Sequence, residues 1–342
     1  MQLPARAHPR WITNLQIASA PDVRYNPSPT MLYRIPFLPW LLVATVVGCS
    51  PRLAEPTSEH PSSGKQQPIV RKVDHILLES TDARALFVLL SESLQMPVSW
   101  PMADFGDFAS GGVSLGNVQL EVLRAGDRIA DEPRARFLGF ALEPEPLERS
   151  LPELRTRQIP FGQPAPFRSR RLLDMGKTLW TTVSMPTISR DAAEIFLCEY
   201  ASEPEDDQTS DEGAPPTPAG GPLSIRKARE IVYGTTDPQA LHDAWRALLD
   251  ESSFQAPDTW LLGSGPAIRI VLADSNSIRA LVIQVASLAQ ARSFLESLAI
   301  PMREDAAAIT LHAPSLAGAT ITLVQGDDAP GQPSGEAAPL PH

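Results

Sequence analysis

The chain has 342 residues and a formal net charge of −11, with 43% apolar and 20% charged residues. This length accommodates two domains of ordinary size. The acidic sequence has no basic stripe and no alternation of basic with aromatic residues, which argues against nucleic-acid binding. Two segments, 201–224 and 327–342, are rich in Pro and Gly, carry much of the negative charge and have no apolar pattern, so we expect both to be disordered.

The N-terminal segment is predicted to be a targeting signal. Residues 1–30 are polar and Pro-rich, and we expect them to be a disordered or untranslated leader, with Met31 as the true start. Residues 31–49 read as a signal peptide: Arg34 precedes about fourteen mostly apolar residues, a run too short to cross a bilayer comfortably. The alternative is a signal anchor that stays uncleaved.

The apolar run ends in Val46-Val47-Gly48-Cys49, which resembles the bacterial lipobox. The resemblance implies that Cys49 is lipidated and becomes the mature N-terminus, so that a lipid anchor holds the protein at a membrane. Ser50 after the cysteine resembles the pattern for outer-membrane delivery, which predicts a location in the cell envelope, on the periplasmic face. The only other cysteine is Cys198, so no intrachain disulfide is expected.

A flexible tether at 50–70 is followed by a first unit of order βαβββ. The strand predicted at 72–80 places Val73, His75, Leu77 and Glu79 on one face by its period of two. Asp82 is the expected N-cap of a helix over 83–94. Strands at 97–102, 108–115 and 118–123 follow, the last two joined by a Gly116-Asn117 turn.

Three further units repeat this order. The second has a strand at 136–142, a helix from 146 to about 158 that Pro152 interrupts, and strands at 160–167, 179–185 and 193–200. The third begins at 230–237, whose pattern matches 75–82, and Asp237-Pro238 starts its helix. The fourth has a strand at 279–286, Ser287 as N-cap, a helix at 288–298 and a hairpin over 308–312 and 319–325.

This α+β tandem repeat, with VDH on the first strand and NVQLE on the fourth, resembles the vicinal oxygen chelate superfamily. That superfamily includes glyoxalase I, bleomycin-resistance proteins and extradiol dioxygenases. The resemblance is good over 72–200 and weaker over 226–325. It implies four βαβββ units paired into two glyoxalase-like bowls of eight strands, which are the predicted domains 71–200 and 225–326. In the superfamily, the first and fourth strands of each unit hold a divalent metal ion.

Carried onto this sequence, the resemblance implies a metal site in the first domain. Its four places fall on His75, Glu121, Leu138 or Gly139, and Glu199, so three of them are competent ligands for Fe, Mn, Zn or Ni. The corresponding places of the second domain fall on Glu230, near Val271, near Ala280 and on Thr322. Only one of these is a competent ligand, so the second bowl is expected to bind no metal.

The residue types alone allow a plainer interpretation. A single histidine on a strand is more often a hydrogen-bonded, half-buried residue than a ligand, and Glu199 at the end of a domain can be a solvated carboxylate. The residues therefore allow both an enzyme and a protein without catalytic activity.

Three functions compete on this sequence. The first is a metal-dependent lyase, isomerase or dioxygenase acting on a small oxygenated molecule. The second is a metal-free protein of the bleomycin-resistance type that binds or sequesters a small-molecule ligand. The third is a surface for a protein partner in the envelope. The sequence does not identify the ligand.

Overall fold

The structure is a computed structural model that describes residues 67–104, 108–125, 135–168, 176–190, 193–201, 220–255, 257–305 and 307–326. The predicted leader (1–30) and signal peptide with Cys49 (31–49) lie outside the described residues, as do the C-terminal tail (327–342) and nearly all of the tether and acidic linker. No helix among the described residues is long and apolar enough to span a membrane.

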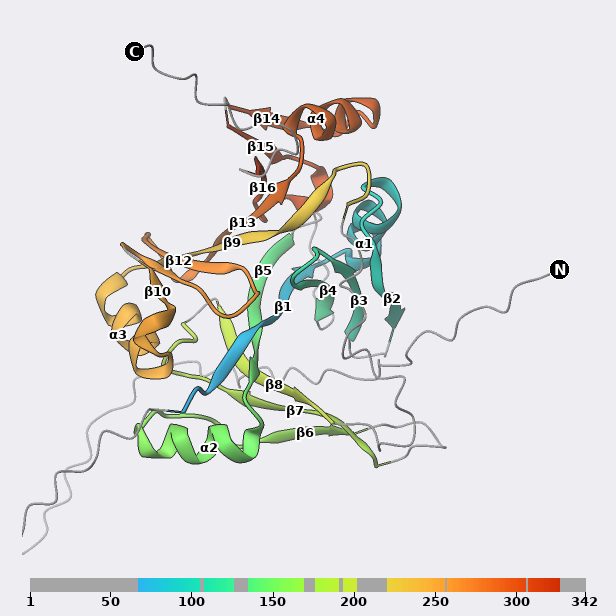
Figure 1. The fold of residues 1–342 in the computed structure, drawn as a ribbon. Helices are drawn as coiled ribbons and strands as arrows, with labels where there is room; N and C mark the ends of the chain where they lie inside the picture. Colours follow the sequence, from blue (N-terminus) through green and yellow to red (C-terminus); the bar gives the residue numbers. More distant parts are fainter. Residues whose placement is uncertain are drawn as a thin grey trace, which may run out of the picture. The chain divides into compact units, whose positions relative to one another are not determined.

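The first sheet has eight strands in the order β2-β3-β4-β1-β5-β8-β7-β6 (Figure 1). Its strands are β1 (Val70–Ser80), β2 (Val98–Asp104), β3 (Phe108–Ser114), β4 (Gln119–Ala125), β5 (Ala135–Pro144), β6 (Ala165–Arg168), β7 (Thr178–Ser184) and β8 (Glu194–Tyr200). Two helices belong to it, α1 (Ala83–Val88) and α2 (Leu147–Thr156). Helix α1 continues into one wider, π-helical turn at Leu89–Ser93, and α2 runs through Pro152 without a break, where the sequence predicted an interruption.

The second sheet repeats this order as β10-β11-β12-β9-β13-β16-β15-β14. Its strands are β9 (Ile225–Thr235), β10 (Phe254–Gln255), β11 (Thr259–Trp260), β12 (Ala267–Leu272), β13 (Ser277–Val285), β14 (Met302–Glu304), β15 (Ala308–Leu311) and β16 (Ile321–Gln325). Helices α3 (Pro238–Leu248) and α4 (Leu288–Ser297) follow β9 and β13. Short 3-10 turns lie at Glu251–Ser253 and Pro314–Leu316.

The strand pairing confirms the predicted pairing of βαβββ units. In the first unit β1 lies parallel to β4, while β4, β3 and β2 form an antiparallel meander. The antiparallel pair β1–β5 joins the first unit to the second, and β9–β13 joins the third to the fourth in the same way. This is the arrangement that the resemblance to the vicinal oxygen chelate superfamily implies.

The helix starts follow from local side-chain chemistry. The Asp82 and Asp237 carboxylates each accept a hydrogen bond from a backbone N–H three residues on, at 3.0 Å, and Ser287 accepts one at 3.1 Å. Such caps satisfy N–H groups that have no partner inside the helix. All three predicted N-caps are therefore confirmed.

One hydrophobic cluster fills the helix side of both sheets. On β1 it takes Ile76 and Leu78, which are fully buried together with Leu86 of α1. Phe140 of the first sheet stacks on Trp245 of α3, with ring centroids 6.2 Å apart. The opposite face of the first sheet, which carries His75, is outside this cluster and is called the histidine face below.

The Gly116-Asn117 turn of the first sheet binds the backbone of the second half of the chain. The side-chain amide of Asn117 donates to the carbonyls of Ala228 and Ser264 at 3.0 Å, and its oxygen accepts from Ala228 N at 2.9 Å. The Asn117 side chain thus binds both the N–H and the C=O of Ala228 on β9, and so connects the two sheets.

We predict that Asn117→Ala lowers the free energy of unfolding by about 1–3 kcal/mol, because the Ala228 N–H then loses its partner away from water. Urea unfolding of the full chain measures the change. Gln290→Ala is the control, since it removes one exposed hydrogen bond to Pro222 and should change stability by no more than about 0.5 kcal/mol. Equal effects of the two substitutions would contradict the role given to Asn117.

Candidate functional site

The structure brings His75 and Glu121 together at the centre of the histidine face. Strands β1 and β4 are parallel neighbours, and Glu121 pairs with Leu77, two residues beyond His75 on the same face. Oε2 of Glu121 lies 3.4 Å from Nε2 of His75. Both residues are nearly buried, with 5% and 7% of their surfaces exposed.

A β-bulge adds Asp74 to this pair. Val73 pairs with Leu142 of β5 and His75 with Ala141, so Asp74 is left without a partner between them. An extra residue of this kind breaks the alternation of faces and re-aims its side chain. Oδ2 of Asp74 accepts a hydrogen bond from Nδ1 of His75 at 2.7 Å. This bond orients the imidazole and directs Nε2 toward Glu121.

Tyr200 of β8 reaches the same carboxylate from the second unit. Its hydroxyl donates to Oδ2 of Asp74 at 3.1 Å, although β5 lies between β8 and β1 in the sheet. The residues of β5 at this point are small: Ala141 pairs with His75, and Gly139 pairs with Leu77. We infer that these small side chains let the tyrosine cross above β5.

The hydrogen-bonded chain continues on the other side of Glu121. Ser110 of β3 donates to Oε1 of Glu121 at 2.6 Å, and the indole of Trp100 on β2 donates to the Ser110 hydroxyl at 3.2 Å. The Trp100 ring lies over Gly112, where a Cβ atom would come within 2.6 Å of three ring atoms. Only glycine leaves room for this ring position.

The charges of the cluster are coupled. Burial alone would lower the pKa of His75, but the hydrogen bond and charge of Asp74, with the charge of Glu121, outweigh it and raise that pKa above its usual value. Burial would likewise raise the pKa of Asp74, yet His75 and the Tyr200 hydroxyl hold it below its usual range. Burial raises the pKa of Glu121, which the charge of His75 and the Ser110 hydrogen bond offset only in part. Both the Asp74 and the Glu121 carboxyl groups therefore favour the charged form of His75.

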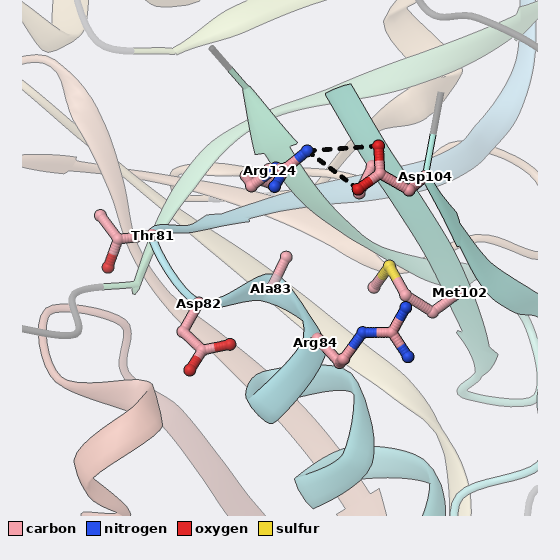
Figure 2. A pocket seen from close by; sticks show the side chains of 8 residues that line it. Thr81, Asp82, Ala83, Arg84, Met102, Asp104 and Arg124 are labelled. Atoms are coloured by element: carbon pink, nitrogen blue, oxygen red, sulfur yellow. Dashed lines mark hydrogen bonds and ion pairs between the residues drawn. The ribbon is translucent and has the colours of Figure 1, made fainter. Parts of the chain in front are cut away.

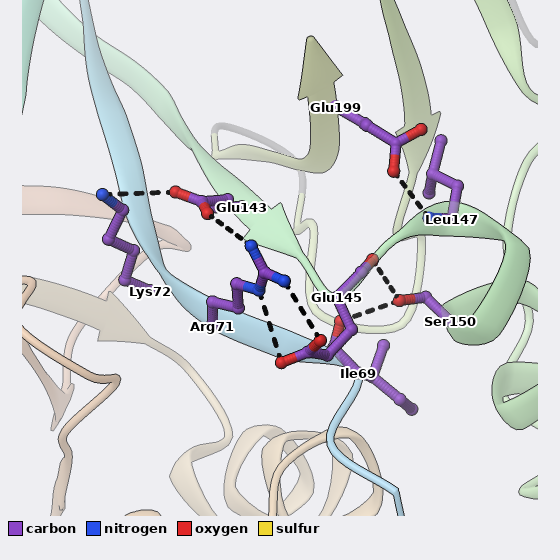
Figure 3. A network of polar contacts seen from close by, with 8 residues as sticks. All are labelled: Ile69, Arg71, Lys72, Glu143, Glu145, Leu147, Ser150 and Glu199. Atoms are coloured by element: carbon purple, nitrogen blue, oxygen red, sulfur yellow. Dashed lines mark hydrogen bonds and ion pairs between the residues drawn. The ribbon is translucent and has the colours of Figure 1, made fainter. Parts of the chain in front are cut away.

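Glu199 does not join His75 and Glu121. It lies on the other face of β8, where its Oε1 accepts a 2.7 Å hydrogen bond from the backbone N–H of Leu147 at the start of α2 (Figure 3). The adjacent network of Arg71 and Lys72 with Glu143 and Glu145 is drawn in the same view. Because α2 starts at a proline without a side-chain cap of its own, the Glu199 carboxylate supplies the missing acceptor.

The strand register shows which residues of this chain occupy the four positions that bind the metal in the superfamily that the sequence resembles. His75 lies seven residues before the N-cap Asp82, and Gly139 lies seven before the N-cap Pro146. Glu121 pairs with the residue two after His75, and Phe196 pairs with Ala141, two after Gly139. The second unit therefore contributes a glycine and a phenylalanine, whose ring meets His75 edge-on at 6.0 Å between centroids.

This donor set does not fit a metal ion held by three or more protein ligands. Two donors, His75 and Glu121, come from the first unit, and Gly139 and Phe196 cannot bind a metal. Within the described part of the chain, no group of three or more His, Cys, Asp or Glu side chains is arranged to hold a metal ion. Nε2 of His75 is buried and has no hydrogen-bond partner among the described residues.

The second sheet has an ion pair in the corresponding place. Glu230 lies seven residues before the N-cap Asp237, and Arg269 pairs with Val232, two residues after Glu230. Nη2 of Arg269 lies 2.8 Å from Oε1 of Glu230. From the sequence this fourth-strand position was expected near Val271, which is two residues too far along the strand. The two remaining places are Ala280 and Thr322, as expected.

Asp74 and Tyr200 were missed by the sequence analysis. Strict alternation along β1 puts Asp74 on the face opposite His75, and a bulge carries no sequence signal strong enough to reverse this. Tyr200 directly follows Glu199, and neighbouring strand residues point to opposite faces. The prediction that put Glu199 on the face of His75 therefore put Tyr200 on the other face. Cys198, on the same face as Tyr200, is a buried free thiol.

A small cavity lies apart from this cluster, beside the start of α1 (Figure 2). Its volume is about 120 Å³, and it is lined by Thr81, Asp82, Ala83, Arg84, Met102, Asp104, Ala109 and Arg124. Arg124 forms an ion pair with Asp104 at 3.2 Å. Sites for small molecules usually enclose roughly 300–1,000 Å³, so this cavity is too small for most ligands.

No protein-family model and no curated protein matches the chain. It is similar to the solved structure of a hypothetical protein from Staphylococcus aureus, with 11% identity and a TM-score of 0.49 over 75% of this chain and 99% of that one. Homoprotocatechuate 2,3-dioxygenase from Arthrobacter globiformis gives 11% identity and a TM-score of 0.48, over 77% and 83% of the two chains. A variant of 4-hydroxymandelate synthase from Streptomyces coelicolor gives 12% and 0.45, over 77% and 95%. Similarity at this level says nothing of this chain's chemistry, and the fold rests on the strand order described above.

We predict that Asp74→Asn lowers the pKa of His75, because the substitution removes the charge that favours the imidazolium. The ring resonances of His75, followed by NMR across pH, measure this. In the wild type, the raised pKa makes the charged histidine stabilising below its unfolded pKa of about 6.5, and this stabilisation is lost as the pH rises through the folded value. The lowered pKa of Asp74 makes its contribution present above about 3.9 and lost as the pH falls through the folded value.

The wild type should therefore exceed His75→Phe in free energy of unfolding by the largest amount between about pH 4 and 6.5, and this difference should decline on both sides of that range. A difference that does not vary with pH would contradict the charge states assigned to the cluster.

Proposed function

We propose that the histidine face of the first sheet binds a small organic molecule, and that it does so without a metal ion held by the protein. The observation that carries this proposal is the donor set: Gly139 and Phe196 occupy two of the four places where a metal site of the superfamily has ligands. This is the binding or sequestering alternative of the sequence analysis, and it requires no turnover.

The chemistry of the face supports a ligand site. The deep polar groups His75, Glu121 and Ser110 lie beside two aromatic rings: Phe196 meets His75 edge-on, and the indole of Trp100 donates to Ser110. Trp180 and Phe167 are half-buried, and Tyr200 is 44% exposed. A few oriented polar groups beside aromatic and apolar surface are typical of small-molecule sites.

A metal-dependent lyase, isomerase or dioxygenase is the second candidate, and one distance favours it. Nε2 of His75 and Oε2 of Glu121 are 3.4 Å apart. Two donors bound at about 2.1 Å to one tetrahedral ion are separated by about 3.4 Å. Asp74 would then orient the histidine from behind, as carboxylates do for many metal-bound imidazoles.

Metal titration separates the two candidates. The full chain is dialysed against EDTA, mixed with Mn²⁺, Fe²⁺, Zn²⁺ or Ni²⁺ alone, passed through gel filtration and assayed by mass spectrometry. We expect far less than one equivalent of any metal to be retained. One equivalent retained by the wild type and lost in His75→Ala would overturn the metal-free proposal in favour of the second candidate.

Glu199→Gln is the matched variant for this experiment. We expect it to leave metal content unchanged and to lower the free energy of unfolding by about 1 kcal/mol, because an uncharged acceptor is weaker at the start of α2. Loss of retained metal in Glu199→Gln would show that Glu199 turns to the histidine face after all.

We also propose that the protein is a lipoprotein of the cell envelope, because residues 46–49 resemble a lipobox. Cys49 carries lipid and holds the folded part at the periplasmic face of the envelope. In a Gram-negative host, the full chain is expected in the membrane fraction with the mass of an acylated protein that begins at Cys49. Cys49→Ser should appear as an unacylated chain instead. A wild-type chain that carries no acyl group would contradict the lipidation of Cys49.

A further inference from the structure

A row of three aromatic side chains crosses the outer strands of the histidine face. Phe167 of β6 pairs directly with Trp180 of β7, and Trp180 pairs directly with Tyr200 of β8. Direct partners on antiparallel strands stand on the same face, with Cβ atoms about 5 Å apart. Phe167 and Trp180 stack with ring centroids 4.3 Å apart and planes 12° apart. One face of the indole is therefore covered by Phe167, and its other face is directed to the side of Tyr200.

A carboxylate lies at the inner end of this row. The Tyr200 hydroxyl donates to Oδ2 of Asp74, which places the negative charge next to the phenol ring. The side chain of Asp74 is 18% exposed, against 7% for His75, so Asp74 is the more accessible member of the pair. A ligand lying against Trp180 and Tyr200 would approach Asp74 before it reached His75 or Glu121.

The charged side chains of this face carry a small excess of negative charge. Cross-strand pairing, alternation and the two bulges of β1 put five acidic groups on it, Asp74, Glu79, Glu121, Glu143 and Glu194, and four basic groups, Arg71, Lys72, His75 and Arg136. Arg71 and Lys72 pair with Glu143, Arg136 with Glu79, and His75 with Asp74. No basic side chain of this set other than His75 is paired with Asp74, the carboxylate next to the aromatic row.

Aromatic faces next to a carboxylate are complementary to an organic cation. The electrons of a Trp or Tyr ring attract an ammonium group placed over the ring, and a nearby carboxylate adds to this attraction. A neutral or anionic molecule of the same shape would gain neither contribution.

We infer that the ligand of the histidine face is an organic cation, an amine or a quaternary ammonium compound, held between Trp180, Tyr200 and Asp74. This inference rests on the proposed small-molecule site and names the class of its ligand. It assigns Trp180 and Asp74 as residues that determine specificity, whereas His75 and Glu121 lie deeper.

Choline and its uncharged isostere 3,3-dimethylbutan-1-ol test the inference, with 4-hydroxybenzoate as an anionic aromatic probe. Binding to the full chain is followed by calorimetry and ligand-observed NMR in the presence of EDTA. We expect choline to bind at least about tenfold more tightly than the isostere. Trp180→Ala and Asp74→Asn should each weaken choline binding about five- to thirtyfold.

Two variants serve as controls. Trp180→Phe keeps an aromatic face and should retain most of the affinity, which distinguishes the loss of the ring interaction from damage to the fold. Leu272→Ala, at a residue of the second sheet that is 75% exposed, should bind choline as the wild type does.

The outcomes separate this inference from the proposed function. If the isostere or 4-hydroxybenzoate binds as tightly as choline, the face binds small molecules but charge does not select them, and the cation inference is overturned alone. If choline binds equally well to Trp180→Ala and Asp74→Asn, the inference is also overturned. If none of the three probes binds, both the inference and the metal-free binding proposal are overturned.

Discussion

The hydrogen bond between Asp74 and His75 is the interaction on which the candidate site depends. It exists because a bulge places two successive residues of β1 on one face of the sheet. Through it the two units of the first sheet share one polar cluster, since Tyr200 of the second unit binds the same carboxylate oxygen. A buried imidazole between two carboxyl groups is costly to assemble, and the hydrogen bonds His75–Asp74 and Ser110–Glu121 offset part of that cost.

The two sheets show how one scaffold holds different chemistry. At the place of His75 and Glu121, the second sheet has Glu230 and Arg269, joined in an ion pair at 2.8 Å. The strand order is the same in both halves. The scaffold is set by apolar side chains on the helix side, whereas the opposite face is free to vary, so pairing of units does not require a site in each pair.

Several features could be predicted from the sequence because their causes are local. Asp82, Asp237 and Ser287 cap helices through bonds to residues three positions away. The meeting of His75 with Glu121 was expected from the resemblance, and parallel pairing of the first and fourth strands brings both side chains to one face. The position of Glu199 was not, because the register of β8 against β5 is set by the packing of the second unit and puts Phe196 in the place of the second glutamate.

The sequence by itself determined the four units, their order and the faces on which most apolar residues lie, because helix and strand periods are properties of neighbouring residues. Through the resemblance it also predicted that one histidine and one glutamate share a face. Only the tertiary structure decided that Asp74 joins them, that Tyr200 reaches across the small residues of β5, and that Glu199 caps α2 instead. A bulge or a one-residue change of register moves a side chain to the opposite face, and the partner strands and helices settle that choice.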